Sequence, residues 1–364
     1  MEIDKSIIQN PLLFQNNRIQ RFYIGGKLLN EWRKEETAED SHMCEELLVT
    51  SIGAISKGEA EGFAVSKTIE SQGNLLLSNI IAQYPNEILG EDFQKYNPGN
   101  LSVLARVGDT KVRLVMQCHP RKEDAKKYFH MPMGKTEAWY IAKTRDEEGQ
   151  EPCVYAGFQK HVTPQLWKEL IEEQDVSRML KCLHRIPVKE GQMILIPAGM
   201  PHCVGPNCLF LEFHECNDVT IRVEKHINGM TVTEEEMYNG LSQEDGLTLF
   251  DYTTYSEEEI RERVLMKGTT LEKGGDYQLE ELIGRQQNDS FGVNLLSLDG
   301  SWIMGRQPYH RIVIAVDGDI ILETEHGRET LIQGHGALIP AECGEIRMTG
   351  TKCKAAIGIP FLPN

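Results

Sequence analysis

Long apolar runs are missing from this 364-residue sequence. A helix that crosses a bilayer needs about 20 consecutive, mostly apolar residues, and no stretch of the chain approaches that length. The first residues, Met1 to Asn10, are too polar and too acidic for a secretory signal peptide. We therefore expect a cytoplasmic protein without a membrane partner.

Basic residues are few relative to acidic ones. The chain has 38 Lys and Arg residues against 55 Asp and Glu residues, which gives a formal net charge of -17 at pH 7. A field of this sign repels nucleic acid and anionic lipid, and no basic stripe compensates for it. The composition therefore argues against a nucleic-acid partner. A small anionic substrate remains possible where local Lys and Arg side chains overcome the global field.

Cysteine pairs of the CxxC type are also missing, although the chain has nine cysteines. An odd number of cysteines in no paired pattern argues against a disulfide framework. We expect reduced thiols, which agrees with a cytoplasmic location.

Short runs of β-forming residues, divided by Gly, Pro and Asn, fill most of the sequence. This pattern is typical of a sandwich or barrel, and the chain is long enough for two cores. We therefore predict a mainly β fold with two β-barrel units. The predicted strands are Val112 to Gln117, Ala138 to Ala142, Val154 to Phe158, Met193 to Ile196, Cys208 to Phe213, Gly292 to Ser297, Arg311 to Val316, Ile320 to Glu325 and Gly336 to Ile339.

Helical patterns interrupt the strands at four places. Leu75 to Tyr84 has apolar residues at helical spacing, and Thr163 to Leu180 opens with an N-cap followed by Pro. Two more helices are predicted at Thr233 to Ser242 and Glu257 to Lys267, the second with Ser256 in a capping box.

These patterns predict three parts of the chain. Residues 1–230 form an N-terminal unit with a helical insertion near 163–181, residues 231–270 form a helical linker, and residues 271–364 form the second β unit. The sequence does not say whether the acidic helices of the linker cover a site or merely connect the two units.

Two Gly/Pro turns show an internal repeat. Gly191 precedes Pro197 by six positions, and Ala198, Gly199 and His202 follow. This spacing is close to the second motif of the cupin superfamily, a jelly-roll barrel whose His binds metal. Gly334 and Pro340 repeat the opening, but Glu342 and Glu345 stand where the motif has Gly and His. The resemblance implies a degenerate, metal-free cupin barrel at the C-terminus.

Four residues are candidates for a metal site. Residues two apart on a strand face the same side, so Gln117 and His119 should both point into a barrel while Cys118 points away. The same reasoning turns Cys203 away from His202. Gln117, His119 and His202 form, with Glu137, a mixed nitrogen and oxygen ligand set. This set suits zinc and, on ligand hardness alone, also iron or manganese.

Four stretches together resemble one family, the class I phosphomannose isomerases, which are zinc cupin enzymes that interconvert mannose 6-phosphate and fructose 6-phosphate. Their order and spacing match the family across residues 20–230, and the C-terminal barrel matches only loosely. The stretches are Gln-Cys-His-Pro at 117–120, Gly-Lys-Thr-Glu-Ala-Trp-Tyr at 134–140, Ile-Pro-Ala-Gly-Met-Pro-His at 196–202, and Leu-Glu-Phe-His-Glu-Cys-Asn-Asp-Val-Thr-Ile-Arg at 211–222.

The resemblance implies a role for each matching residue. The N-terminal unit would be the catalytic cupin domain, with one Zn²⁺ per chain. Arg222 matches the catalytic arginine of the family, and Lys135 matches a lysine that lines the sugar pocket and belongs to the catalytic and substrate-binding set. Arg106 stands where the family has a substrate-binding Lys. The implied zinc ligands are Gln117, His119, Glu137 and His202.

The sequence departs from the family at Val115, where a Ser usually helps to hold the phosphate. A Val side chain cannot make that hydrogen bond, so the exact sugar phosphate remains open. The alternatives are an isomerase of another phosphosugar and a non-catalytic sugar-phosphate sensor. An iron-dependent cupin oxygenase is disfavoured because Gln117 replaces the second His of a His-x-His pair. The oligomeric state, the proton-shuttling base and the role of the C-terminal barrel remain open.

Overall fold

The structure is a computed structural model that describes residues 3–54, 63–147 and 149–362. The prediction of a mainly β fold is confirmed. The strands are β1 (Leu12–Leu13), β2 (Arg18–Ile19), β3 (Glu45–Val49), β4 (Val103–Thr110), β5 (Gln117–Cys118), β6 (Glu137–Thr144), β7 (Cys153–Gln159), β8 (Leu183–Pro187), β9 (Met193–Ile196), β10 (His202–Val204), β11 (Cys208–Glu215), β12 (Ile221–Arg222), β13 (His226–Ile227), β14 (Met230–Thr231), β15 (Thr254–Tyr255), β16 (Leu265–Met266), β17 (Thr269–Lys273), β18 (Tyr277–Ile283), β19 (Phe291–Met304), β20 (Arg311–Asp317), β21 (Ile320–Glu323), β22 (Arg328–Leu331), β23 (Gly336–Ile339) and β24 (Ile346–Pro360).

Short helices connect these strands. They are α1 (Lys27–Trp32), α2 (Leu77–Gln83), α3 (Pro85–Leu89), α4 (Glu91–Tyr96), α5 (Lys122–Phe129), α6 (Pro164–Glu173), α7 (Val176–Lys181), α8 (Glu234–Tyr238), α9 (Gln243–Thr248) and α10 (Glu257–Val264), with 3-10 turns at Lys5–Gln9 and Glu70–Gln72. None of the helices in the described part of the chain has the length and apolar content that a bilayer crossing requires.

Seven of the nine predicted strands lie wholly within observed strands, and β9 and β23 match their predicted bounds. The strand predicted from Ile320 ends at Glu323 instead of Glu325, and the strand predicted at Val112 to Gln117 is wrong over most of its length. Residues 112–116 do not form a regular strand, and pairing begins at Gln117. The backbone N–H of Met116 donates to the carboxylate of Glu224 at 2.7 Å instead of to a strand carbonyl. This side-chain acceptor replaces the ladder bond that the alternating pattern predicted.

The predicted helix caps are confirmed. The hydroxyl of Thr163 accepts the N–H of Leu166 at the start of α6, and Ser256 forms the predicted capping box with Glu259. The predicted helix from Thr163 to Leu180 is divided in two, because Gln174 adopts a left-handed conformation with φ 53°.

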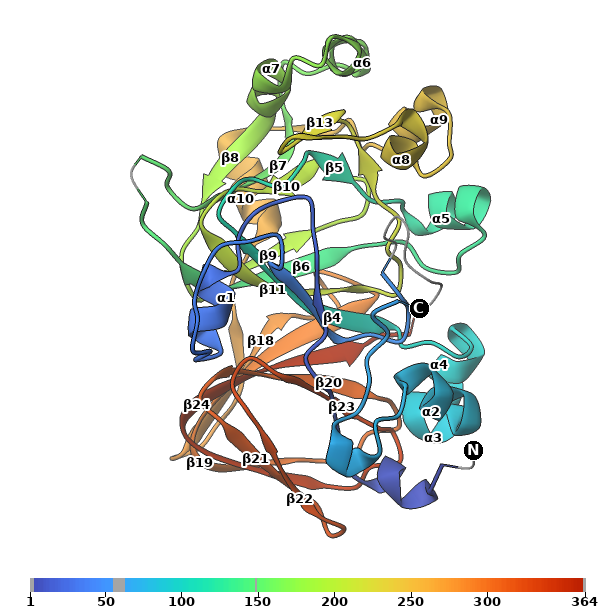
Figure 1. Cartoon of the computed structure of the whole chain (residues 1–364), viewed down its shortest axis with the longest axis vertical. Coiled ribbons are helices and arrows are strands. Elements are labelled where there is room, and N and C mark those ends of the chain that lie inside the picture. Colours follow the sequence, from blue (N-terminus) through green and yellow to red (C-terminus); the bar gives the residue numbers. More distant parts are fainter. Residues whose placement is uncertain (1–2, 55–62, 148, 363–364) are drawn as a thin grey trace.

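Two sheets form the barrel of the N-terminal unit. The first has the order β16-β9-β6-β11-β4-β3-β2, and the second has the order β12-β5-β10-β7-β15, with β8 joined to β7. Apolar side chains such as Ile141, Val154 and Phe210 fill the space between them. The other face of the second sheet is covered by α6, α7, α8 and α9, which bury Trp167 and Phe250 (Figure 1).

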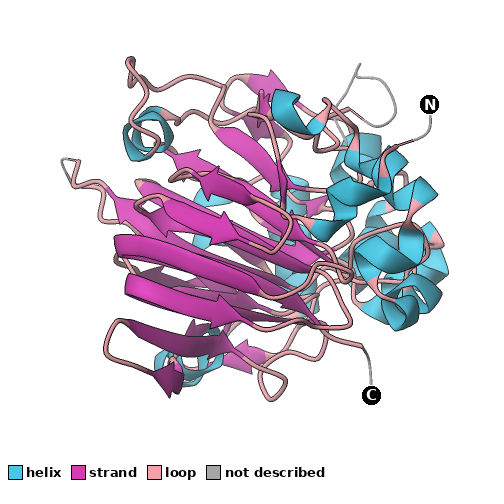
Figure 2. Ribbon diagram, turned by 90° about the horizontal axis from the view of Figure 1, so that it is seen from below, coloured by secondary structure: helices cyan, strands magenta, loops and turns pink. Residues whose placement is uncertain are grey.

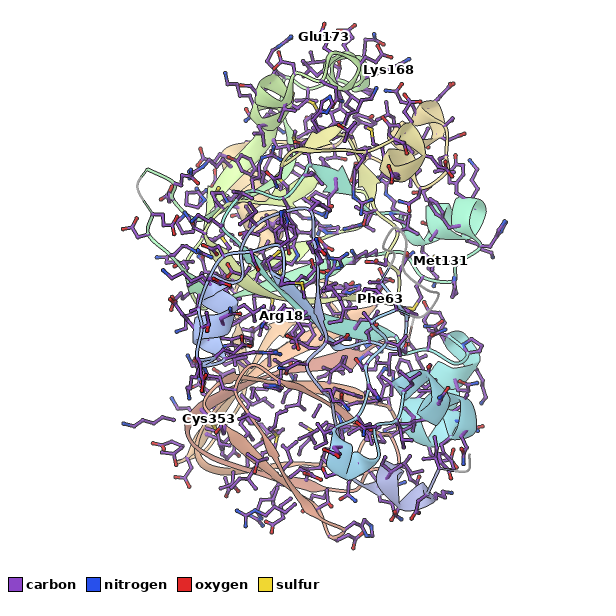
Figure 3. All side chains as sticks on the ribbon, in the orientation of Figure 1. Arg18, Phe63, Met131, Lys168, Glu173 and Cys353 are labelled. Atoms are coloured by element: carbon purple, nitrogen blue, oxygen red, sulfur yellow. The ribbon has the colours of Figure 1, made fainter. Side chains whose placement is uncertain are left out.

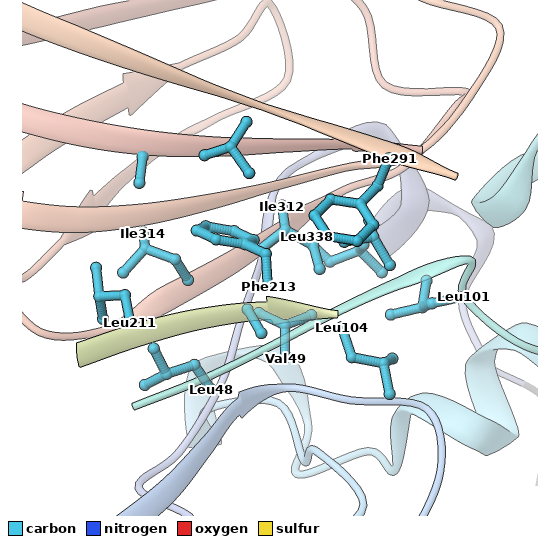
Figure 4. Close-up of a cluster of buried hydrophobic side chains, with 14 of the residues drawn as sticks. Leu48, Val49, Leu101, Leu104, Leu211, Phe213, Phe291, Ile312, Ile314 and Leu338 are labelled. Atoms are coloured by element: carbon cyan, nitrogen blue, oxygen red, sulfur yellow. The ribbon is translucent and has the colours of Figure 1, made fainter. Parts of the chain in front are cut away.

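Nine strands form the sheet of the C-terminal barrel, in the order β1-β23-β20-β24-β19-β18-β17 with β21 and β22 attached. Its outer face packs on the first sheet of the N-terminal barrel. Figure 4 shows Phe213 of that sheet against Ile312, Ile314 and Leu338 of the C-terminal barrel. The shared layer holds the two barrels together through buried apolar area.

Segments from the start of the chain also contact the C-terminal barrel. Strand β1 pairs with β23, and the indole N–H of Trp32 donates to the carbonyl of Val316 at 2.7 Å. Figure 2 shows most helices gathered at one side of the stacked sheets, close to the N-terminus. Figure 3 shows Lys168 and Glu173 on α6 at the opposite end of the molecule from the C-terminal barrel.

Candidate metal centre

Three buried side chains converge inside the N-terminal barrel. The two carboxylate oxygens of Glu137 lie 3.1 Å from Nε2 of His119 and 3.1 Å from Nε2 of His202. One ligand atom from each residue lies within 4.8 Å of the others. All three side chains are buried. The group therefore has the spacing of a metal site.

Backbone carbonyls fix the orientation of both imidazoles. Nδ1 of His119 lies 2.9 Å from the carbonyl of Val219, and Nδ1 of His202 lies 2.8 Å from the carbonyl of Met200. Each Nδ1 therefore carries the proton, and each Nε2 presents a lone pair to the carboxylate. Gly199, with φ 83°, allows the tight turn that brings Met200 to this position.

The electrostatics of the group call for a cation. Burial, followed by the charge of Lys135, lowers the pKa of His119 to about 3, so its imidazole is neutral. Nε2 of His119 and both carboxylate oxygens of Glu137 lack a hydrogen-bond partner. Bare acceptors 3.1 Å apart repel each other, and a metal ion between them would satisfy all of them. The donor set fits a divalent cation.

Gln117 lies at the edge of this group. Its amide nitrogen lies 3.3 Å from Nε2 of His202, the residue directly opposite it on β10. A half-turn of the amide would present its oxygen at the same place. Cys118 and Cys203 point to the other side of the sheet, where they pack under the helices, so the predicted direction of these thiols is confirmed.

A chain of charged contacts leads from Glu137 across the first sheet. Nζ of Lys135 lies 3.4 Å from Glu137 and 3.9 Å from Glu212, and Glu212 is 2.6 Å from Arg106. Arg106 also pairs with Glu45 at 3.3 Å and with Asp218 at 3.5 Å. Arg106 is therefore held by three carboxylates next to the candidate metal centre.

Arg222 lies on the opposite side of Gln117 from His202. It pairs with Gln117 across β12 and β5, and directly opposite residues on neighbouring strands project to the same face. Its guanidinium makes long hydrogen bonds, of 3.5 Å to the carbonyl of Thr220 and 3.4 Å to that of Glu236 on α8. Burial lowers the pKa of Arg222 from its usual value. One of the acidic helices, α8, therefore lies against this edge of the site.

The fold brings three further polar residues here that were not predicted as site residues. Glu212 and His214 are buried on the barrel side of β11, and Asp218 follows in the next loop. Burial raises the pKa of Glu212 to about 7, although the charge of Arg106 acts to lower it. Period-two alternation with the apolar Leu211 and Phe213 was a signal for Glu212 and His214. No local signal marked Asp218.

The fold and this group define a double-barrelled cupin with a candidate metal centre. Comparison with solved structures gives the fold directly. The mannose 6-phosphate isomerase of Bacillus subtilis superposes with a TM-score of 0.73 at 18% identity, covering 96% of this chain and 99% of that one. A point variant of phosphomannose isomerase from Salmonella typhimurium gives 0.70 at 14% identity, covering 97% and 100%. The predicted cupin fold is confirmed.

The curated relatives found by sequence are, like these solved structures, named mannose-6-phosphate isomerases. The chain is 31% identical over 121 residues to a probable mannose-6-phosphate isomerase of Bacillus subtilis, and the matched segment covers 33% of this chain and 36% of that protein. It is 26% identical over 213 residues to the mannose-6-phosphate isomerase of Streptococcus mutans, and this matched segment covers 58% of this chain and 60% of that protein. The matched segments span less than two thirds of either relative. No family model matches the chain. The resemblance to phosphomannose isomerases is nevertheless confirmed by sequence and by fold.

Proposed function

We propose that this chain is a zinc-dependent aldose–ketose isomerase that interconverts mannose 6-phosphate and fructose 6-phosphate. The observation that carries the proposal is the position of Lys135, a buried cation 3.4 Å from the carboxylate that lies between His119 and His202. A metal-binding group beside a proton-carrying amine suits chemistry at a carbonyl. The names of the sequence relatives and structural neighbours support the same activity.

In this proposal His119, Glu137, His202 and the amide of Gln117 hold one Zn²⁺ per chain. Two imidazoles and a carboxylate are a common ligand set for catalytic zinc, which keeps a position open. A bound zinc ion would supply Lewis-acid charge for an oxygen of the substrate. Among the four ligands only Gln117 is partly exposed, and its neighbour Arg222 is partly exposed as well. We therefore infer that the sugar approaches the metal from the side of Gln117 and Arg222.

The isomerisation moves a proton between C1 and C2 through a cis-enediol. Negative charge develops on the substrate oxygen as the proton leaves, and the guanidinium of Arg222 would stabilise it from a partly desolvated position. Lys135 and Glu212 are the candidates to carry the proton, because Nζ of Lys135 lies between the carboxylates of Glu137 and Glu212. Arg106, fixed by Glu45, Glu212 and Asp218, would hold a phosphate oxygen of the substrate.

A coupled assay for fructose 6-phosphate formation from mannose 6-phosphate, with zinc-loaded protein, tests the proposal. We expect turnover in the wild type and a loss of about 10²–10³-fold in Arg222→Ala, the size typical of a lost oxyanion donor, with zinc content unchanged. Arg185→Ala is the matched control, because Arg185 is exposed and pairs with Glu151 on the surface.

Two outcomes would contradict the proposal. A near-normal rate in Arg222→Ala would remove Arg222 from the mechanism. No turnover by protein that binds zinc stoichiometrically would instead favour another phosphosugar or a sensor. Buried Val115, which offers no hydroxyl to a phosphate, would then be the first position to examine.

A further inference from the structure

The two barrels share a repeat whose charge is inverted in the second. Strands β6 and β20 begin with Glu137 and Arg311, respectively. Glu137 pairs with Ile196 on β9, and Arg311 pairs with Ile339 on β23. Each Ile is followed by Pro and Ala. Arg311 therefore occupies in the C-terminal barrel the position that the candidate metal carboxylate occupies in the N-terminal barrel.

The turns before the paired strands strengthen this equivalence. Gly191 and Gly334 precede β9 and β23 at the same spacing, and both adopt left-handed backbone with φ 85° and φ 83°. A residue with a Cβ is strained in that conformation, so both turns depend on Gly. The correspondence therefore extends beyond one pair of residues.

Arg311 points into the C-terminal barrel. Val313 and Ala315, two and four residues later on β20, belong to the apolar core of that barrel, whereas Ile312 and Ile314 face the N-terminal barrel. Alternation along the strand places Arg311 on the side of Val313. Its cross-strand neighbour Ile339 also belongs to the barrel core. A guanidinium therefore stands at the end of an otherwise apolar interior.

No acidic partner offsets this buried cation among the residues that the structure describes. Arg311 is 4% exposed. Its Nη1 donates to the carbonyl of Gly305 at 2.8 Å, but Nε and Nη2 have no acceptor. Glu342 and Glu345, on the neighbouring loop, are exposed, and Glu342 pairs with Arg306. A buried charge without a partner is strongly unfavourable, so the site calls for an anion.

The geometry of the free donors indicates which anion. Nε and Nη2 lie along one edge of the planar guanidinium, and their N–H bonds are parallel. This edge can bind two oxygens of a carboxylate or phosphate at once. Open space lies beside Gly305, whose carbonyl accepts from Nη1 of Arg311.

We propose that the C-terminal barrel binds a small oxyanion, held by the Nε and Nη2 edge of Arg311 beside the loop that contains Gly305. The first barrel presents acceptors to a cation, and the second presents donors to an anion at the equivalent position. The site is separate from the candidate metal centre and does not depend on the proposed isomerase activity.

Crystals of the full chain soaked in selenate test this site directly. We expect an anomalous peak within hydrogen-bonding distance of Nε and Nη2 of Arg311, and no such peak in Arg311→Met, a variant of similar length without charge. Competing soaks with phosphate and with acetate identify the natural class, because the better ligand removes the selenate peak. A wild-type crystal with water or nothing at Arg311 would overturn the proposal.

Thermal unfolding with added phosphate gives the solution test. We expect the apparent Kd for phosphate to rise at least tenfold in Arg311→Met, equivalent to about 1.4 kcal/mol. Arg311→Lys keeps the charge without the two-donor edge and should fall between the two. Isomerase turnover without phosphate should be the same in all three proteins. Equal phosphate responses in the wild type and Arg311→Met would refute the assignment.

Discussion

The carboxylate of Glu137 lies 3.1 Å from Nε2 of His119, whose other ring nitrogen lies against the carbonyl of Val219. The proton of His119 lies on the other nitrogen, toward the carbonyl of Val219, and the low pKa of the ring keeps Nε2 bare. Two acceptors at this distance are stable in a buried site only when a cation joins them. This contact is the physical basis of the first prediction.

Replacing His119 or His202 by Ala should reduce the bound metal from one ion per chain to a small fraction. Each change removes one of the convergent ligands, and the remaining pair cannot hold the ion in a closed set. Metal content after dialysis, measured by mass spectrometry, tests this. Cys118→Ser and Cys203→Ser are matched controls, because these thiols pack on the opposite face of the sheet and should leave the metal content unchanged. A His119→Ala protein with full metal content would contradict the assignment.

Arg106→Ala should lower the free energy of unfolding by about 3–5 kcal/mol, since it leaves Glu45, Glu212 and Asp218 facing one another with one cation fewer. Denaturant unfolding at neutral pH measures the loss. The exposed Arg185→Ala should change stability by less than about 0.5 kcal/mol. Similar losses in the two variants would mean that the carboxylates around Arg106 do not depend on it.

The stability of the protein should fall as the pH drops from about 6.5 to about 4, in part because of His310. Burial lowers the pKa of His310 to about 4. Nε2 of its ring accepts the N–H of Ser102, and Nδ1 lies against the carbonyl of Leu89. The unfolded chain binds the proton first, so the stability rises with pH across this window and falls as the pH drops, by up to about 3 kcal/mol.

His310→Gln should flatten that dependence, whereas His161→Gln, at an exposed position, should leave it unchanged. Unfolding free energies measured across the window in metal-free protein provide the comparison. An identical slope in His310→Gln and the wild type would show that His310 does not contribute.

Phe213→Ala should destabilise the protein by about 3–5 kcal/mol, the cost of a large cavity in a core. Phe213 is fully buried between the barrels, beside Gly358 of β24. Ile303→Ala removes a side chain that is 42% exposed and should cost far less. Thermal or denaturant unfolding distinguishes the two. A small loss in Phe213→Ala would indicate that the layer between the barrels can collapse around the gap.

Five correctly predicted strands have side chains that are nearly all buried, on both faces of the sheet; they are β6, β9, β11, β20 and β23. In β6, for example, Ile141 faces the barrel interior and Tyr140 faces the C-terminal barrel. Residues 112–116 are also rich in apolar side chains but pair differently, since Glu224, more than a hundred positions later, accepts the N–H of Met116. Local sequence patterns cannot predict that a side chain so distant in the chain will compete for a backbone N–H.

By itself, the sequence determined the mainly β class, the helix caps at Thr163 and Ser256, and the face on which Gln117 and His119 lie, because these depend on neighbouring residues and on the period of the backbone. The tertiary structure alone decided that Glu212 and Asp218 enclose Arg106, and that Arg311 lies in an apolar barrel without an acidic partner. Charges acquire partners and shifted pKa values only when the fold removes water and brings distant strands together.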